Sequence, residues 1–335
     1  MVLLENGYLA TGSEDRTVKI WDTINGKLKY TFDYNVNGGH RSYVYALCGL
    51  PDGYLASGSF DGEIKIWDII NGKLIYTFDK NNGGHYGSID TLISFEESSF
   101  LVSASWDNDV KVFDMKNLKL KYTLEHDSSV YAMCQVNEDF VASGCKNGKI
   151  KIWNIKTGKL EYSFDEKGQA HNESIRTMIM LNNYHLASAS QDETIKIWNL
   201  NNGDLIVTLR GHTNMVEHLV LLQNGLLASG SDDGSIKLWD VQKGELKYTF
   251  DKLNGGHTWD ITSLVSFNNG YLVSSSFDRN IIIWDYLNEK VLFKLDSSIG
   301  GHNRPIQSIC LLENQYLSSA GTDGVIKVWD ISISD

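Results

Sequence analysis

The chain has 335 residues, 42% of them hydrophobic, which is enough to bury a substantial core in one large domain or two. Thirty Lys and Arg residues against 42 Asp and Glu residues give a formal net charge of −12 at pH 7. This acidity disfavours binding to a phosphate backbone, which attracts clustered cations, so we expect no nucleic-acid partner.

The first residues, MVLLENGYLATGS, lack the basic start and long apolar run of a signal peptide. No later run approaches the roughly 20 apolar residues of a membrane-spanning helix. Only four cysteines occur, and three of them, Cys48, Cys134 and Cys310, fall at one repeated place that we interpret as a core position. We therefore expect no membrane contact and a cytoplasmic or nuclear location.

In chain order, the predicted elements are short β-strands that recur in one fixed sequence. A partial unit begins at MVLLEN (1–6), and the second unit shows the full pattern, with strands expected over 43–50, 54–59, 63–68 and 73–78. The third strand of every unit carries an aromatic residue near its end, at Trp21, Trp67, Phe113, Trp153, Trp198, Trp239, Trp284 and Trp329. Four strands every 40 to 46 residues predict an all-β propeller of four-stranded antiparallel blades.

The number of blades stays open between eight and seven. We count about thirty strands, with three in the first unit, four in each of six units, and three in the last unit, which stops at WDISISD. Eight turn-and-aromatic units favour eight blades with thin first and last sheets, and the alternative is seven blades with displaced N-terminal strands. We expect one domain over residues 1–335, whose missing strands are compatible with truncation at both ends.

A His precedes seven of the aromatic positions by 27 or 28 residues, at His40, His85, His126, His171, His212, His257 and His302. A Ser-containing strand and a turn that usually holds Asp lie between the His and the aromatic residue. The Gly-His pair, the turn Asp and the Trp-Asp pair together resemble the WD-repeat (WD40-type) family over the whole chain.

The resemblance implies that a His, a strand Ser, the turn Asp and the Trp form a structural hydrogen-bonded set within a blade. Carried over by register, these sets are His40, Ser57, Asp61 and Trp67; His171, Ser188, Asp192 and Trp198; His212, Ser229, Asp233 and Trp239; His257, Ser274, Asp278 and Trp284; and His302, Ser319, Asp323 and Trp329. Phe113 replaces a Trp, Asn147 replaces a turn Asp and Glu125 replaces a Gly, so we expect the third and fourth blades to be the softest.

A Ser, His and Asp in every unit do not indicate a catalytic triad, because an enzyme does not need its nucleophile many times over. The other two histidines, His185 and His218, lack Cys or His partners at metal-ligand spacing. We therefore expect no catalytic residues, no metal and no cofactor.

The resemblance implies a non-catalytic scaffold that binds a protein or peptide, as a monomeric propeller that is a subunit or substrate-recognition module of a larger assembly. A propeller-based enzyme or small-molecule binder is the alternative. Nearly all length variation lies between the aromatic position and the next His, in loops that open on the face of the Asp turn, called the top. Gly-Gly pairs at 38–39, 83–84, 255–256 and 300–301 precede His, and we interpret them as flexible loops.

By family analogy, the residue before the turn Asp and residues near the start of the inner strand point out of the top face. Side chains suited to partner binding at these places are Tyr43, Tyr45, Phe60, Trp106, Tyr131, Lys146, Arg176 and Phe277. Glu217, Asp232 and Asp260 occupy the same places in the sixth and seventh blades. The alternative is that the aromatic rings pack on neighbouring loops and stay covered.

Overall fold

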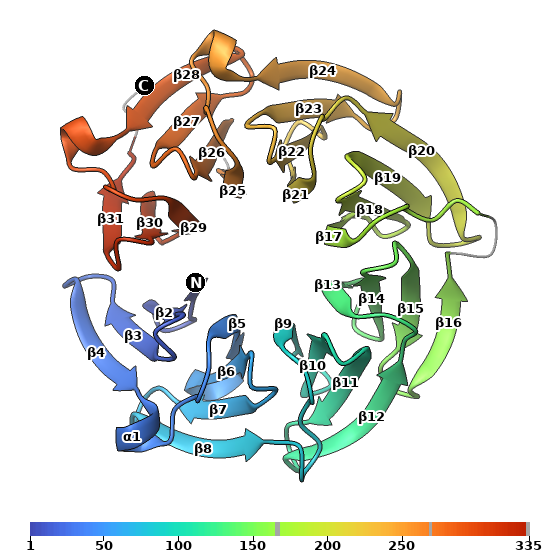
Figure 1. The fold of residues 1–335 in the computed structure, drawn as a ribbon, viewed down its shortest axis with the longest axis vertical. Coiled ribbons are helices and arrows are strands. Elements are labelled where there is room, and N and C mark those ends of the chain that lie inside the picture. Colours follow the sequence, from blue (N-terminus) through green and yellow to red (C-terminus); the bar gives the residue numbers. More distant parts are fainter. Residues whose placement is uncertain (165–167, 268–269, 333–335) are drawn as a thin grey trace. The chain divides into compact units, whose positions relative to one another are not determined.

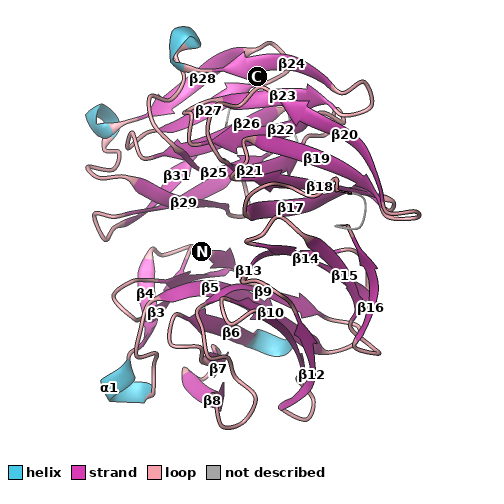
Figure 2. Ribbon diagram, turned by 45° about the vertical axis from the view of Figure 1, so that its right-hand side comes forward, coloured by secondary structure: helices cyan, strands magenta, loops and turns pink. Residues whose placement is uncertain are grey.

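The computed structural model describes residues 1–164, 168–267 and 270–332. Its chain forms two compact units, residues 1–170 and 171–335. Each unit contains four antiparallel sheets, and Figure 2 shows strands joined by turns and loops, with short helical turns in a few of the loops. Among the described residues, no helix has the length and apolar character needed to cross a membrane.

The first unit holds sixteen strands in four sheets, which we call blades one to four. Its strands are β1 (Val2–Leu3), β2 (Tyr8–Gly12), β3 (Val18–Asp22) and β4 (Lys27–Phe32); β5 (Val44–Leu50), β6 (Tyr54–Ser59), β7 (Ile64–Asp68) and β8 (Lys73–Phe78); β9 (Ile89–Phe95), β10 (Phe100–Ser105), β11 (Asp109–Asp114) and β12 (Lys119–Glu125); and β13 (Val130–Gln135), β14 (Phe140–Cys145), β15 (Ile150–Asn154) and β16 (Lys159–Ser163). Within this unit the inner strands β5, β9 and β13 follow one another from blade to blade (Figure 1).

The second unit holds blades five to eight, again in sequence order. Its strands are β17 (Ile175–Asn182), β18 (His185–Ser190), β19 (Thr194–Asn199) and β20 (Asp204–Arg210); β21 (Val216–Leu221), β22 (Leu227–Ser231), β23 (Ile236–Asp240) and β24 (Glu245–Phe250); β25 (Ile261–Ser266), β26 (Tyr271–Ser276), β27 (Ile281–Asp285) and β28 (Lys290–Leu295); and β29 (Ile306–Leu311), β30 (Tyr316–Gly321) and β31 (Ile326–Asp330).

The all-β fold class with eight propeller blades is confirmed, and the seven-bladed alternative is wrong. Our strand count of thirty was one short, because the first sheet contains the two-residue strand β1, which pairs antiparallel with β2. The last sheet has three strands among the described residues, as expected. That residues 1–335 form one domain stays a prediction.

The turn between the second and third strands is built the same way in every blade. The residue after the turn Asp, or after its counterpart, is left-handed, with φ between 67° and 81° at Arg16, Gly62, Asn108, Gly148, Glu193, Gly234, Arg279 and Gly324. Gly62 also lies against the next blade, where an added Cβ would come within 2.4 Å of the His85 carbonyl oxygen. The Asp turn and the loop before the next His therefore share one face, which we call the top face of a unit.

The Gly-Gly pairs are close-packed rather than flexible. The longer loops fold into short capped turns, the helix α1 (Tyr34–Asn37) and the 3₁₀ turns Lys252–Asn254 and Ser297–Ile299, each capped by the Asp side chain before it. Another 3₁₀ turn, Pro51–Gly53, joins β5 to β6. At three of the pairs the first Gly caps the turn in a left-handed conformation. At Gly39, an added Cβ would come within 2.6 Å of the Asp33 backbone, so only glycine fits there.

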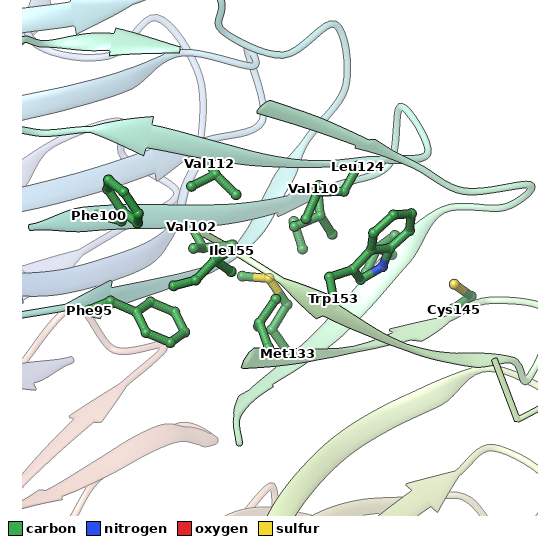
Figure 3. Close-up of a cluster of buried hydrophobic side chains, with 13 residues drawn as sticks. Phe95, Phe100, Val102, Val110, Val112, Leu124, Met133, Cys145, Trp153 and Ile155 are labelled. Atoms are coloured by element: carbon green, nitrogen blue, oxygen red, sulfur yellow. The ribbon is translucent and has the colours of Figure 1, made fainter. Parts of the chain in front are cut away.

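The core lies between neighbouring blades. Figure 3 shows one cluster in which Phe95 and Val112 of blade three meet Met133 and Trp153 of blade four. Within a unit, the aromatic residue of the third strand packs on the outer strand of the preceding blade, and the Trp67 ring stacks on Phe32 at a centroid distance of 4.3 Å. Truncating such a fully buried ring costs about 3–5 kcal/mol. The aromatic repeat in the sequence therefore records packing from blade to blade.

Candidate functional site

The residue before the turn Asp is fixed beside the start of the inner strand of its own blade. The Phe60 N–H donates to the Tyr43 carbonyl oxygen (2.8 Å), and the Trp106 N–H donates to that of Ser88 (3.0 Å). The Phe277 N–H makes the same bond to Asp260 (3.0 Å) in the second unit. This backbone bond brings the side chains of two separate sequence positions together on the top face.

Five aromatic side chains of the first unit form a continuous row there, which we call the aromatic strip: Tyr43, Tyr45, Phe60, Trp106 and Tyr131. Phe60 contacts Tyr43, which precedes β5, and Tyr45 of β5, at centroid distances of 6.3 and 6.4 Å. The Trp106 ring lies edge-to-face between Phe60 and Tyr131, 5.8 Å from each. Despite these contacts, Tyr43, Tyr45, Phe60 and Trp106 remain 43% to 47% exposed, and Tyr131 is partly buried.

Polar contacts hold the centre of the aromatic strip in place. The Trp106 indole N–H donates to the Asp90 carboxylate (2.6 Å), and the Ser88 hydroxyl donates to its other oxygen (3.1 Å). The Ser129 hydroxyl donates to the Trp106 carbonyl oxygen (2.9 Å). Trp106 therefore has one preferred orientation before any partner arrives.

The three remaining predicted binding residues lie outside the aromatic strip. Lys146 is exposed after β14, at the position before the turn of blade four, where its N–H donates to the Ser129 carbonyl oxygen (2.8 Å). Arg176 and Phe277 belong to the second unit. The Arg176 guanidinium pairs with the Glu217 carboxylate (2.9 Å) on the neighbouring inner strand β21, and Phe277 is partly buried.

The acidic residues of the second unit affect one another's protonation. Burial, together with the charges of Glu217 and Asp260, raises the pKa of Asp232 to about 7 against the opposing charge of Arg176. Burial also raises the pKa of Asp260. These positions of the second unit therefore carry carboxyl groups, while Phe60 and Trp106 occupy the corresponding turn positions in the first unit.

The His, Ser, Asp and Trp positions of blades five to eight lie within hydrogen-bonding distance of one another. In blade six, His212 Nδ1 is 2.9 Å from Asp233 and His212 Nε2 is 2.7 Å from Ser229 Oγ, which accepts the Trp239 indole N–H at 2.8 Å. Since Ser229 Oγ accepts from the indole, its own proton points at Nε2, and Nδ1–H donates to the carboxylate. The matching distances in the other blades are 2.8–2.9 Å for His171, Ser188, Asp192 and Trp198; 2.7–2.9 Å for His257, Ser274, Asp278 and Trp284; and 2.8–2.9 Å for His302, Ser319, Asp323 and Trp329.

The sets in the first unit depart from this pattern. In blade two, His40 and Trp67 both bond Ser57, but His40 Nδ1 is 3.7 Å from Asp61 and has no hydrogen-bond partner. In blade three, His85 bonds Ser103 (2.6 Å) and Asp107 (2.9 Å), and Phe113 supplies no N–H.

The hydrogen bonds of blade four also differ, and in this blade Asn147 replaces the turn Asp. His126 Nδ1 donates to the Leu124 carbonyl oxygen (2.8 Å), and the Trp153 indole N–H donates to His126 Nε2 (3.2 Å) rather than to Ser143. Burial and the charge of Lys151 together lower the pKa of His126 to about 4. That blades three and four are the softest stays a prediction.

Burial decides what these sets can do chemically. Ser57, Ser188, Ser229, Ser274 and Ser319 are fully buried, so none of these hydroxyls can reach a substrate. Burial raises the pKa of Asp278, but hydrogen bonds from His257 and the backbone outweigh it and hold the pKa at about 2. A buried carboxylate that accepts hydrogen bonds from a His side chain and the backbone is a structural acceptor.

One group of side chains has the spacing of metal ligands. Among the described residues, His40, Asp61 and Glu63 each place a ligand atom within 4.8 Å of the others. The Lys65 ammonium lies 2.9 Å from the Glu63 carboxylate. A bound cation would have to displace this internal ion pair, so the group favours an ion pair over a metal.

Two large exposed side chains of the top loops were missed by the sequence reasoning. Tyr86 directly follows His85 and is 78% exposed, and Trp259 follows His257 by two residues and is 62% exposed. A comparison of the residues that follow each repeated His would have found both.

Comparison with known proteins agrees with the repeat pattern. The family described as "WD domain, G-beta repeat" matches eight segments: 5–22, 26–68, 72–114, 118–154, 159–199, 203–240, 244–285 and 293–330. Most segments begin at a fourth strand and end with the third strand of the next sheet, so a sequence repeat straddles two blades. No curated protein sequence matches the chain.

Among solved structures, the chain is similar to the crystal structure of the computationally designed Ika8 protein. The two share 30% sequence identity at a TM-score of 0.81, over 97% of this chain and 93% of that chain.

Proposed function

Because this chain belongs to the WD40-repeat family, whose propellers are generally non-catalytic scaffolds, we propose that it binds a protein or peptide through the top face of its first unit. In this proposal the chain acts as a subunit or substrate-recognition module of a larger assembly. The observation that supports it most is the aromatic strip, which places five adjoining rings on the top face of the first unit.

The residue types of the aromatic strip and the fixed positions of its rings suit a binding surface. Trp and Tyr dominate the residues that contribute most to protein interfaces, since they bury a large area and lose few rotamers. The Trp106–Asp90 hydrogen bond and the ring–ring contacts fix the rings before binding, which reduces the ordering entropy that a partner must overcome. Four of the rings stay nearly half exposed in spite of these contacts, which favours recognition over packing.

The class of partner follows from charge and from the other polar groups. A net charge of −12 disfavours a nucleic acid. The repeated Ser and His side chains are buried in the blade sets, so the residues that would first suggest an enzyme have a structural role. A protein or peptide segment that covers adjoining aromatic rings fits the remaining surface.

Alanine substitution in the aromatic strip tests the proposal. A partner co-purified with the full chain would be identified by mass spectrometry and its affinity measured for the native chain and for Trp106→Ala. We expect a loss of about 2 kcal/mol or more, roughly 30-fold in Kd, with little change in melting temperature. Ile24→Ala is the control, because Ile24 is 92% exposed in the turn at the opposite end of β3 from the Asp15 turn.

Two results would contradict the proposal. One is a partner that binds the Phe60→Ala, Trp106→Ala, Tyr131→Ala triple variant as tightly as the native chain. The other is a sharp fall in melting temperature for Trp106→Ala alone, which would show that the ring contributes to folding rather than to recognition.

A further inference from the structure

One edge of blade eight has no neighbouring strand among the described residues. Its sheet runs in the order β29, β30 and β31, and β31 pairs only with β30 there, whereas the third strand of every other blade also pairs antiparallel with a fourth strand. The Ile331 N–H donates to the Gln315 carbonyl oxygen, next to β30. Because N–H groups alternate between the two edges of a strand, those of Val328 and Asp330 point away from β30. Within the described chain, this edge therefore presents backbone groups of the kind to which a further strand adds.

The sequence of β31 is almost that of a strand which is paired on both edges elsewhere in the chain. Its residues, IKVWD (326–330), differ from those of β7, IKIWD (64–68), only at the third place. The residue at that place is 45% exposed in β31, as Val328, and 2% exposed in β7, as Ile66. Charged side chains often discourage pairing at a sheet edge, but β7 carries the same Lys and Asp and pairs with β8. The strand that pairs with β7 therefore indicates what can pair with β31.

The fourth strands of the other seven blades share one pattern of side chains. They read KLKYTF, KLIYTF, KLKYTL, KLEYSF, DLIVTL, ELKYTF and KVLFKL, beginning at residues 27, 73, 119, 159, 204, 245 and 290. In all seven blades the third residue of the pattern has no partner on the third strand, which makes a β-bulge at the same place. Side chains also pair across the two strands, as where the Lys65 ammonium donates to the Thr77 hydroxyl (3.2 Å). The pattern therefore specifies the length, the side chains and the register of a strand that pairs with a third strand in this chain.

We infer that the open edge of β31 binds an extended segment of a partner protein that carries this pattern and adds antiparallel as the fourth strand of blade eight. In the register of β7 and β8, the fourth residue of the segment lies opposite Val328 and the second lies opposite Trp329. A second copy of this chain is not the occupant, because each of its seven fourth strands already pairs within its own blade. The inference goes beyond the proposed function, since it adds an interaction surface on the second unit.

A synthetic peptide that copies residues 71–80, NGKLIYTFDK, is the probe, because it contains β8. Its binding to the full chain would be followed by fluorescence polarisation, and we expect saturable binding at one site per chain. A peptide that lacks the bulged residue, NGKLYTFDK, should bind about tenfold or more weakly, because without the bulge the side chains on one side of the deletion face the wrong way.

Variants of the chain locate the site. Val328→Pro removes an N–H that points away from β30 and keeps the bonds to β30, since proline is tolerated where the N–H of an edge strand faces solvent. It should weaken peptide binding about fivefold or more, the loss of one hydrogen bond. Val328→Ala keeps the N–H and is the control, which should lose less affinity than Val328→Pro. Trp106→Ala, in the aromatic strip, should leave the affinity for this peptide unchanged.

Several outcomes would overturn the inference. They are a native chain that does not bind the peptide, equal binding of the peptide without the bulged residue, and unchanged binding by Val328→Pro. Loss of binding in Trp106→Ala would place the peptide on the aromatic strip instead. Light scattering that shows dimers of the native chain, abolished by Val328→Pro, would make a second copy the occupant. The comparison of the two peptides uses the native chain, so it decides the question even if Val328→Pro lowers the melting temperature.

Discussion

Replacing Asp233 with alanine removes the carboxylate of the blade-six set, which accepts four hydrogen bonds. Its two oxygens accept from His212 Nδ1 (2.9 Å), the Thr213 N–H (3.0 Å), the Ser235 N–H (2.8 Å) and the Ser235 hydroxyl (2.6 Å). Thr213 is exposed, so water can replace its acceptor, and the Ser235 hydroxyl can rotate. The His212 side chain is 1% exposed and cannot reach water.

The expected loss follows from that one buried donor, whose nearest remaining acceptor is the Ser235 hydroxyl oxygen at a long 3.3 Å. An unsatisfied buried donor costs about 1–3 kcal/mol of the free energy of unfolding. For a unit of this size, each kcal/mol lowers the melting temperature by roughly 2–4 °C. Urea unfolding followed by tryptophan fluorescence, together with thermal melts, would measure both quantities on the native chain and on Asp233→Ala.

Asn147→Ala is the matched control, at the same turn position of blade four. The Asn147 side chain is exposed and accepts a long bond from the Lys149 N–H (3.3 Å), while His126 Nδ1 already donates to the Leu124 carbonyl oxygen. Its truncation should change stability by about 0.5 kcal/mol or less, as for an ordinary surface site. An equal or larger loss at Asn147 than at Asp233 would refute the assignment of the turn carboxylate as the main acceptor.

Three further changes test other parts of the structure. The pKa of His126 is lowered from 6.5 to about 4, mainly by burial, so the stability from its neutral form is complete above pH 6.5 and is lost as the pH falls toward 4. Urea unfolding across this pH range should therefore show a smaller loss of stability for His126→Gln than for the native chain. The pKa of Asp232 is raised to about 7, so the stability from its protonated form is lost as the pH rises from about 4 to 7. Asp232→Asn should therefore stabilise the chain more at pH 8 than at pH 5, and an equal effect at both would contradict this pKa. Gly256→Ala would place a Cβ 2.5 Å from the Asp251 carbonyl oxygen and should lower the melting temperature, whereas an unchanged melt would show that the loop is flexible.

The sequence predicted the blades well because each blade repeats the same physical requirements. The aromatic residue that stacks on the preceding blade, as Trp67 does on Phe32, and the left-handed residue of each turn, as Gly62, recur at fixed spacing. The strand β1 was left out of the strand count because residues 1–6 match only the end of an inner strand, and two residues, Val2 and Leu3, give no alternating pattern. The role of the Gly-Gly pairs was misread because their cause is a backbone approach across the loop, as between Gly39 and Asp33, which no local pattern records.

The candidate site was harder to predict than the fold. The sequence placed Phe60 and Trp106 in turns, but their contact depends on two adjacent blades, and its geometry became visible only in the structure. The hydrogen bond from Trp106 to Asp90 joins a turn to an inner strand and has no sequence signature. The pairing of Arg176 with Glu217, between neighbouring inner strands, was likewise hidden by the 41 residues that separate them.

The blade sets explain why the aromatic strip can exist where it does. In blades five to eight the turn Asp and the buried His and Ser hold the turn from below, with distances of 2.7 to 2.9 Å in the set of His212. The residue before that Asp bonds the start of the inner strand through its backbone N–H, as Phe60 does to Tyr43, and this bond does not depend on the kind of side chain. The side chain at this position can therefore differ from blade to blade, from Phe60 to Lys146 or Asp232. Because the backbone of the turn is the same in every blade while the side chain before the turn Asp varies, one repeated fold can present aromatic rings in one unit and carboxyl groups in the other.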